Sequence, residues 1–246
     1  MPVEDLIHHV NLTGLAGEGS LYQTGDHVAA WFGGLHLHSL FEPVADLERE
    51  QIVGHIAHLS AHDADGQAVP TVDAYARLET DAAVVQFDRL SRTLHALNFL
   101  AQRQWAGGFL QLAVHPRHLS AVRQDHGLVF EAILKRCGLA PEDILLDVRG
   151  SDLSAPAVQQ ALANYRQRGY RISAPWPYPA GVPIDQVVHD AGASAAGNTQ
   201  ALPRRLANGL LHAGDLAIFR QAGFRLACGP LIGRPESRCR TTHSRL

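Results

Sequence analysis

The chain has 246 residues, 46% of them apolar and 18% charged, and its 21 Lys and Arg against 24 Asp and Glu give a net charge of −3. This composition supplies enough apolar surface for a core and excludes global disorder, and the length suits one large α/β domain. The slight acidity excludes the broad basic surface that nucleic-acid-binding proteins use, so we expect no nucleic-acid partner.

Neither a membrane segment nor a secretion signal is indicated. No apolar run approaches the ~18 residues that cross a membrane. The first residues, MPVED, lack the basic and apolar regions of a secretory signal. Cys137, Cys228 and Cys239 are far apart and odd in number, which predicts neither a disulfide framework nor a zinc site. We therefore expect a cytoplasmic protein without a membrane partner.

Strand and helix patterns alternate through the chain. Residues 1–35 are rich in glycine and lack a periodic pattern, which predicts an N-terminal extension. Apolar runs typical of buried strands then alternate with segments of helical spacing. The expected strands are 109–114, 144–148, 170–174 and 224–227, and the expected helices are 87–105, 127–136, 158–165 and 215–222. This alternation indicates a parallel sheet covered on both faces, and a closed (β/α)8 barrel and an open doubly wound sheet both satisfy it.

Six segments give a more specific signal than periodicity. In chain order they are LFEPV (40–44) with IVGHIAHL (52–59), LAVHPRHL (112–119), ILLDVRGS (144–151), RGYRISA (168–174), PIDQVVHD (183–190) and ACGPLIGRP (227–235). In that order they resemble the motifs of EAL domains, which are bacterial phosphodiesterases of cyclic di-GMP. The resemblance implies an α/β fold, a modified TIM (β/α)8 barrel of EAL type, over residues 36–235. Residues 236–246 are polar and basic without an apolar face, which predicts a disordered tail.

The resemblance also implies where a catalytic site would lie, and the residues at that site have changed. In EAL domains, carboxylates and an amide at the C-terminal ends of barrel strands hold divalent cations that activate a water. The matching positions, in chain order, are Glu42 (a glutamine in the family), Ile56 (the Glu of E-A-L), Ser60 (an arginine that contacts phosphate), His115 (the metal-binding Asn), Asp147 (the first Glu of E-I-T-E), Pro175 and Trp176 (the aspartate pair of D-D-F-G), Val188 (the catalytic Lys), Asp190 (an aspartate that is kept), Asn208 (a glutamate) and Cys228 (a glutamine that contacts the ligand). Without these carboxylates and the lysine, two cations and a water have too few ligands. We expect a degenerate EAL domain with no catalytic residue, metal or cofactor.

Fifteen histidines raise the separate question of a single metal. His115, Asp147 and Asn208 form the one trio that the barrel would bring together at its mouth. The other histidines lack a third ligand at zinc spacing, so we interpret them as surface or hydrogen-bonded core residues.

Three functions stay open at this point. The first, which we favour, is an inactive relative of the phosphodiesterases that acts in bacterial signalling and regulation by binding another protein or a second copy of itself. The second is a receptor that binds cyclic di-GMP without hydrolysing it, and only weakly, because Glu42 would repel the dianionic ligand. The third is an enzyme with new chemistry, for which no specific reaction is indicated. Residual phosphodiesterase activity stands apart from these three and ranks below the first two.

Two segments are predicted to alter the outside of the barrel. The sequence APWPYP (174–179) replaces the D-D-F-G loop, and its prolines stiffen the backbone. Trp176 and Tyr178 are candidate interaction residues, because both residue types are enriched at interfaces. The alternative is that their rings plug the barrel mouth. Residues 191–206 have few large apolar side chains, which predicts that one crossover helix is reduced or missing there.

Overall fold

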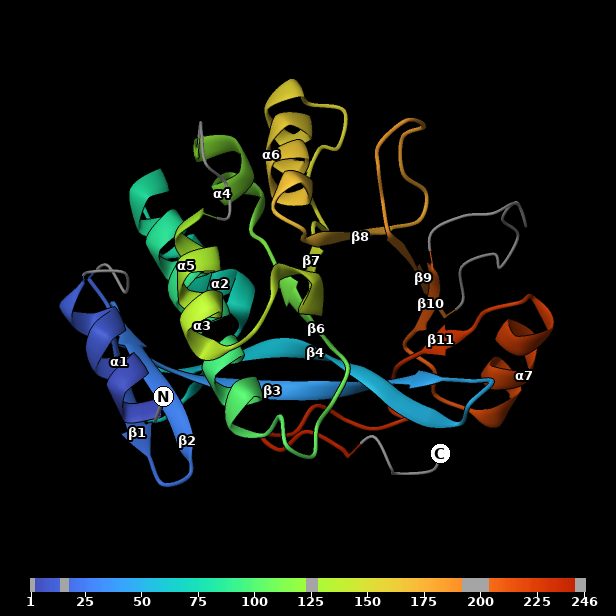
Figure 1. Ribbon diagram of the computed structural model, residues 1–246, viewed down its shortest axis with the longest axis horizontal. Helices are drawn as coiled ribbons and strands as arrows, with labels where there is room; N and C mark the ends of the chain where they lie inside the picture. The colour runs from blue at the N-terminus through green and yellow to red at the C-terminus, as the bar shows by residue number, and fades with distance from the viewer. Residues whose placement is uncertain (1–2, 14–17, 123–127, 192–203, 242–246) are drawn as a thin grey trace.

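The computed structural model describes residues 3–13, 18–122, 128–191 and 204–241. Eight strands close into a barrel, with helices outside it (Figure 1). In order of pairing, the barrel strands are β3 (Leu35–Asp46), β11 (Leu226–Ala227), β10 (Arg204–Asn208), β9 (Gln186–Asp190), β8 (Arg171–Pro175), β7 (Ile144–Asp147), β6 (Phe109–Ala113) and β4 (Gln51–His62). The sheet closes because β3 also pairs with β4. The closed barrel is confirmed, and the open doubly wound sheet is excluded.

One barrel strand runs against the others. Strands β4 and β6 to β11 pair in parallel, whereas β3 is antiparallel to both of its neighbours, β4 and β11. The register of β3 on β4 places Glu42 opposite Ile56 and shifts between Val44 and Ala45. The barrel is therefore a modified one, as the resemblance implies.

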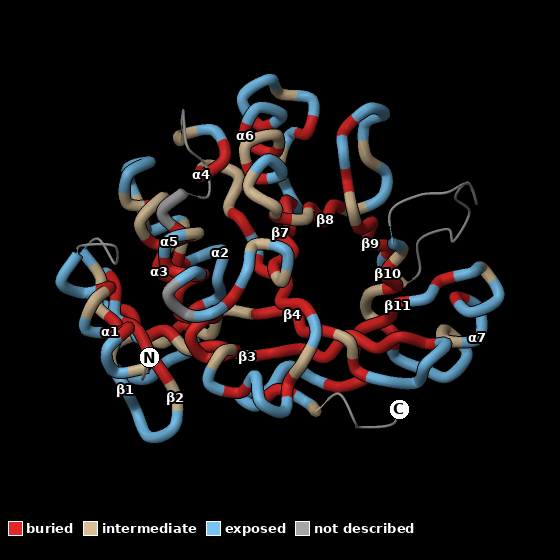
Figure 2. The backbone as a smooth tube through the Cα atoms, in the orientation of Figure 1, coloured by how far each residue is buried: buried red, intermediate tan, exposed pale blue. Residues whose placement is uncertain are grey.

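Helices cover most of the outer wall. They are α2 (Thr71–Ala76) and α3 (Asp81–Ala101) between β4 and β6, α4 (Pro116–Ala121), α5 (Leu128–Cys137) and the 3-10 turn η1 (Pro141–Asp143) between β6 and β7, α6 (Pro156–Gln167) before β8, and α7 (Ala213–Gln221) before β11. Thr80 caps the N-terminus of helix α3: its hydroxyl accepts the Ala83 N–H. Its Phe87, Leu90 and Leu94 recur every three or four residues and are fully buried, so one face of α3 packs into the core (Figure 2). Within the described ranges, no helix combines the length and hydropathy that crossing a bilayer requires.

The N-terminal segment extends the barrel sheet. Helix α1 (Val3–Leu12) is followed by a hairpin of β1 (Ser20–Thr24) and β2 (His27–Phe32), and β2 pairs with β3. The buried Asn98 amide on α3 accepts the Val28 N–H and donates to the Val28 carbonyl, both at 2.8 Å. Leu6 and Val10 of α1 are part of the main core. At the far side, the two-residue β5 (Ala68–Val69) pairs with β4.

The connection from β8 to β9 has no helix. Residues 176–185 form turns and irregular backbone. The prolines of this connection lack an N–H and restrict the residues that precede them, and a helical crossover needs about a dozen residues. The crossover between β8 and β9 is therefore reduced to a loop. The predicted position, residues 191–206, lies for the most part outside the described residues.

The C-terminal segment corrects a prediction. The Cys239 N–H donates to Gln102 Oε1 at 2.8 Å, and the Arg240 N–H donates to His55 Nε2 at 3.1 Å. Cys239 is only 6% exposed. Residues 236–241 are thus ordered against the barrel rather than a disordered tail. No sequence pattern indicates this packing, because backbone groups, and not an apolar face, make the key contacts. The remaining five residues lie outside those described.

Candidate functional site

Apolar side chains lie inside the barrel at three of the positions that match functional residues of the EAL motifs. Ile56, Val188 and Cys228 belong to one buried cluster, and none is more than 8% exposed. The rest of the cluster is Val44, Phe109, Leu145, Leu206 and Leu226. Aliphatic groups offer a cation no lone pair, and a charge placed among them would lose its hydration without compensation.

Glu42 lies at the edge of this cluster, on β3. Its Oε2 is 2.8 Å from His58 Nε2, and its side chain is 11% exposed. The His58 imidazole therefore binds the carboxylate that stands where the EAL motif has a glutamine. Ser60, two residues further along β4, is half-buried and pairs with His38 of β3.

Asp147 ends β7 and has both carboxylate oxygens in use. Its Oδ1 accepts the Arg149 N–H at 3.1 Å, and its Oδ2 lies 3.1 Å from the Arg149 guanidinium and 3.2 Å from Gln111 Nε2. The Gln111 carbonyl oxygen accepts from Gln186 Nε2 at 2.9 Å. Gln111 and Gln186 are at most 1% exposed. A buried chain of amides therefore fixes Asp147 from inside the barrel.

Asp190 is the aspartate that the motif comparison finds unchanged. Asn208 Nδ2 donates to Asp190 Oδ1 at 2.7 Å, and the Cys228 thiol donates to Asn208 Oδ1 at 3.1 Å. Burial raises the pKa of the Cys228 thiol far above its ordinary range, so it stays protonated. These three residues do meet, but as a hydrogen-bonded series and not as a set of anionic ligands.

His115 lies at the start of α4, beside a cavity at the barrel mouth. Its Nδ1 accepts the Arg117 N–H at 3.2 Å, and its ring stacks on Tyr75 with centroids 4.1 Å apart. Burial lowers the pKa of His115, which favours the neutral ring. The cavity holds about 460 Å³ between α2, α4 and Arg149, and its polar lining is Thr71, Tyr75, His115, Arg117 and Arg149.

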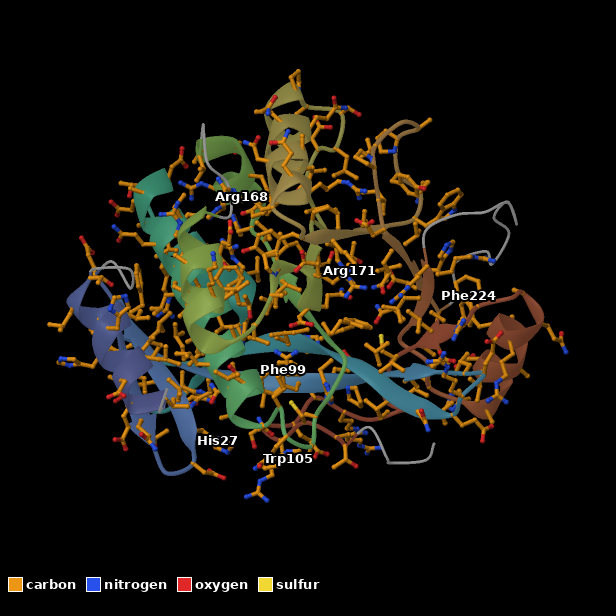
Figure 3. The ribbon with its side chains drawn as sticks, viewed as in Figure 1. His27, Phe99, Trp105, Arg168, Arg171 and Phe224 are labelled. Atoms are coloured by element: carbon orange, nitrogen blue, oxygen red, sulfur yellow. The ribbon has the colours of Figure 1, made fainter. Side chains whose placement is uncertain are left out.

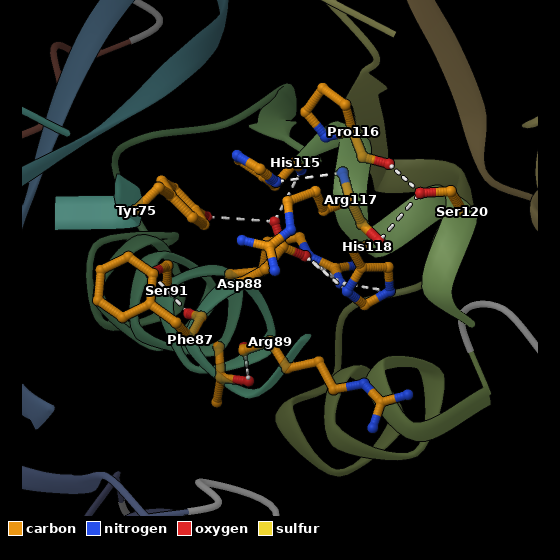
Figure 4. Close-up of polar contacts among 12 residues, drawn as sticks. Tyr75, Phe87, Asp88, Arg89, Ser91, His115, Pro116, Arg117, His118 and Ser120 are labelled. Carbon is orange, nitrogen blue, oxygen red and sulfur yellow. Dashed lines mark hydrogen bonds and ion pairs between the residues drawn. The ribbon is translucent and has the colours of Figure 1, made fainter. Parts of the chain in front are cut away.

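A buried charged cluster supports this cavity from behind (Figure 4). Asp88 Oδ2 accepts from Arg92 at 2.7 Å and lies 3.0 Å from His118 Nδ1. Its Oδ1 accepts the His115 N–H at 2.9 Å and the Tyr75 hydroxyl at 3.3 Å. Although burial opposes ionisation, Arg92 and then His118 hold the pKa of Asp88 well below its usual range. One carboxylate on α3 thus fixes both the start of α4 and the ring on α2.

Sequence analysis missed this cluster. Its only signal is an aspartate and an arginine four residues apart on an otherwise apolar helix face. That spacing is common on exposed helices, and only the fold shows that the pair is buried.

Trp176 lies on the outside of the barrel. Its backbone N–H donates to the Val188 carbonyl at 2.9 Å, and its ring stacks on His189, 5.5 Å between centroids. Val188 points into the barrel, so the next side chain, His189, points outward. Trp176 is 43% exposed. The rings of Trp176 and Tyr178 pack edge to face, with their centroids 6.0 Å apart. Trp176 therefore covers part of the wall that lacks a helix, and it does not plug the mouth. Pro175, just before it, ends β8.

Solved structures share this architecture, whereas neither a protein-family model nor a curated protein matches the chain. A standalone EAL protein from Vibrio cholerae O395, bound to c-di-GMP, is 14% identical, with a TM-score of 0.67 over 84% of this chain and 95% of that one. Klebsiella pneumoniae BlrP1, in a manganese and cyclic di-GMP complex, is 16% identical, with a TM-score of 0.66 over 94% and 66%. The EAL domain of Mycobacterium smegmatis DcpA is 15% identical, with a TM-score of 0.61 over 81% and 93%. This chain has the EAL fold.

The donors at this EAL-type mouth do not fit the two divalent cations that the resemblance implies. Within the described part of the chain, no three His, Cys, Asp or Glu side chains are placed to hold a metal ion. The members of the trio that the sequence left open each have a partner of their own: His115 accepts the Arg117 N–H, Asp147 pairs with Arg149, and Asn208 donates to Asp190. The carboxylates of Glu42, Asp147 and Asp190 are bonded instead to His58, Arg149 and Asn208.

Proposed function

We propose that this chain is a non-catalytic EAL-type domain that acts in bacterial cyclic di-GMP signalling by binding another protein. One observation carries the proposal: Ile56 and Val188, at the positions of the ligating Glu and the catalytic Lys, pack together inside the barrel. Phosphodiester hydrolysis of the EAL type needs cations that activate water and neutralise phosphoryl oxygens. An aliphatic pair at these positions supplies neither a ligand nor a proton carrier.

Hydrolysis is tested with purified protein, cyclic di-GMP and either Mg²⁺ or Mn²⁺. We expect no linear dinucleotide above a no-protein blank. The matched control is Asp147→Asn, prepared in the same way: product that forms equally in both samples comes from a host enzyme. Product that forms with the native chain and disappears in the variant would contradict the proposal.

The outer wall at β8 and β9 supports the second half of the proposal. A helix normally covers each pair of parallel strands in such a barrel, and here a ten-residue connection replaces it. Trp176 remains 43% exposed there, beside Tyr178. Large aromatic side chains at a sparsely covered wall are typical of protein interfaces.

Association is tested with Trp176→Ser and Tyr178→Ser combined. Sedimentation velocity of the chain alone reports a second copy, and the same variant in a binding assay reports a partner once one is isolated. We expect weaker association with an unchanged circular dichroism spectrum. Trp105→Ser is the control, because Trp105 has the same 43% exposure on a different surface. Equal association of all variants would argue against this surface.

The cavity at the mouth supports a second candidate, a cyclic di-GMP receptor. Arg117 and Arg149 line about 460 Å³ beside the stacked rings of Tyr75 and His115, and guanidinium and aromatic groups suit a phosphate and a base. Calorimetric titration with cyclic di-GMP, with and without Mg²⁺, separates the candidates. Micromolar binding of cyclic di-GMP that is abolished in Arg149→Gln would favour the receptor function over protein binding.

A further inference from the structure

Arginines gather at the end of the barrel opposite the mouth. Arg171 begins β8, Arg204 and Arg205 begin β10, Arg225 precedes β11, and Arg49 lies in the turn between β3 and β4. Parallel strands all start at the same end of a barrel, so four chain segments place five guanidinium groups around one opening. This end is separate from the positions discussed so far, because TIM-barrel sites lie at the C-terminal ends of the strands.

Two adjoining cavities open among these arginines. One, of about 420 Å³, is lined by Asp46, Arg49, Phe109, Arg204, Arg205 and Arg225. The other, of about 240 Å³, is lined by Phe109, Arg171, Asp185, Gln186 and Arg204. Phe109 and Arg204 line both, so the two form one cleft across the bottom of the barrel. We call it the basal cleft.

Positive charge exceeds negative charge in the basal cleft. Of its two carboxylates, Asp46 is bound by Arg225 at 2.9 Å, and Asp185 is bound by Arg166, from outside the cleft, at 2.6 Å. Within the described ranges, no carboxylate forms an ion pair with Arg49, Arg171 or Arg204. The sequence of residues 192–203, which precedes Arg204, contains no Asp or Glu. Among the described residues, Arg49, Arg171 and Arg204 therefore have no direct ion-pair partner, although the charges of Asp185 and Asp143 act on Arg171.

Several of these guanidinium groups are held in place before any ligand arrives. Arg205 lies over the ring of Phe224, which Figure 3 labels, at 3.8 Å and donates to the Ala222 carbonyl at 2.9 Å. Arg171 lies 5.8 Å from the centroid of Phe109, and its Nε is buried without a hydrogen-bond partner. Arg171 and Arg204 line the same cavity. Burial and then the like charge of Arg204 lower the pKa of Arg171, and Asp185 and Asp143 offset part of this effect.

We propose that the basal cleft binds a small phosphate-bearing anion with at least two negative charges. Guanidinium groups bind phosphate oxygens in pairs of hydrogen bonds, and a dianion would relieve the repulsion between Arg171 and Arg204. The cleft is too small for a folded partner. The net charge of −3 also gives the whole chain no attraction for a long polyanion. This inference is independent of the proposed function, because none of the residues involved lies at the mouth or on the Trp176 surface.

Calorimetric titration of the full chain with pyrophosphate tests the proposal, with Arg171→Gln and Arg204→Gln as variants. We expect saturable binding that each variant weakens about tenfold or more, as the loss of a charge-assisted pair of hydrogen bonds implies. Arg77→Gln is the matched control, because Arg77 is exposed at the end of α2. A Tm measured without ligand establishes that each variant is folded. Arg204→Lys, which keeps the charge but not the paired geometry, should recover only part of the binding.

Other ligands distinguish the source of the phosphate. Tighter binding of ADP or GDP than of pyrophosphate would assign the site to a nucleotide, and equal binding would assign it to the phosphate groups alone. The proposal is overturned if pyrophosphate does not bind, if Arg77→Gln weakens binding as much as Arg204→Gln, or if hexaglutamate binds and pyrophosphate does not.

Discussion

The Trp176 indole stacks on the His189 imidazole, with their planes 16° apart. The ring takes the place of a covering helix over this part of β9, and burial lowers the pKa of His189. We therefore expect Trp176→Ala to raise that pKa toward 6.5, the ordinary value. NMR titration of the imidazole protons measures the change. Trp105→Ala should leave His189 unaffected, and a His189 pKa that is equal in all three proteins would contradict the argument.

Restoring one ligand should harm the fold without restoring activity. In Ile56→Glu, the new carboxylate would lie among Val188, Cys228 and the aliphatic cluster, so its pKa should rise and the free energy of unfolding should fall by about 3 kcal/mol. Urea unfolding measures the loss. Ile56→Gln serves as a control, because it has the same size without the charge. Manganese-dependent hydrolysis of cyclic di-GMP by Ile56→Glu would show that the remaining donors suffice.

The buried Asp88 cluster should contribute strongly to stability. Asp88→Asn removes the charge that Arg92 and His118 face at 2.7 and 3.0 Å, which leaves a buried cation without compensation. We expect the free energy of unfolding to fall by about 3–5 kcal/mol. Asp143→Asn breaks the exposed pair with Arg103 and should cost less than about 1 kcal/mol. Similar losses of unfolding free energy in the two variants would mean that the buried Asp88 cluster stabilises the fold no more than a surface ion pair does.

Stability should fall as the solution becomes mildly acidic. Burial lowers the pKa of His55 to about 4 and that of His95 to about 3, from 6.5. Below pH 6.5 the unfolded chain binds protons that these folded side chains do not, so the loss starts there and continues down to the folded pKa values. At pH 5.5 each histidine should cost about 1.4 kcal/mol.

Urea unfolding at pH 7.5, 6.5 and 5.5 measures this dependence. His95→Gln, which retains a polar group near Ser39, should show a shallower slope than the native chain. His8→Gln is the control, because His8 is exposed on α1 and should keep the native slope. A native stability that does not change between pH 7.5 and 5.5 would mean that the two rings are hydrated in solution.

Removal of residues 1–35 should yield insoluble protein. The deletion takes away Val28, which leaves the oxygen of the buried Asn98 amide without its donor and the amide nitrogen with only Ser39 Oγ, at 3.2 Å. It also uncovers the core face on which α1 packs. Expression followed by centrifugation, with thermal unfolding of any soluble fraction, measures the outcome. A soluble truncation that unfolds cooperatively would show that the extension folds separately from the barrel.

The barrel was predictable from sequence, and much of the site's geometry was not. Ordered motifs around Ile56, Asp147 and Asp190 specify strands, because each motif contains a buried apolar run next to a polar end. The Asp88 cluster could not be predicted, because the (i, i+4) spacing of Asp88 and Arg92 does not indicate whether the pair is buried. The missing helix between β8 and β9 was not foreseen, although the prolines of that connection are a physical signal for it. The reduced helix expected within residues 191–206 stays a prediction, because most of that segment lies outside the described residues.

A barrel normally has no sheet edges, yet this one has two. Strands β3 and β4 are each 12 residues long and extend past the closure, where β2 and β1 add on one side and β5 on the other. The outermost strands are short, five residues in β1 and two in β5, which limits the row of open backbone groups that other chains could join. If β1 were lost, the open edge would move to β2, whose Val28, Ala30 and Phe32 are buried. The hairpin therefore protects the chain from aggregation by keeping an apolar strand paired on both sides.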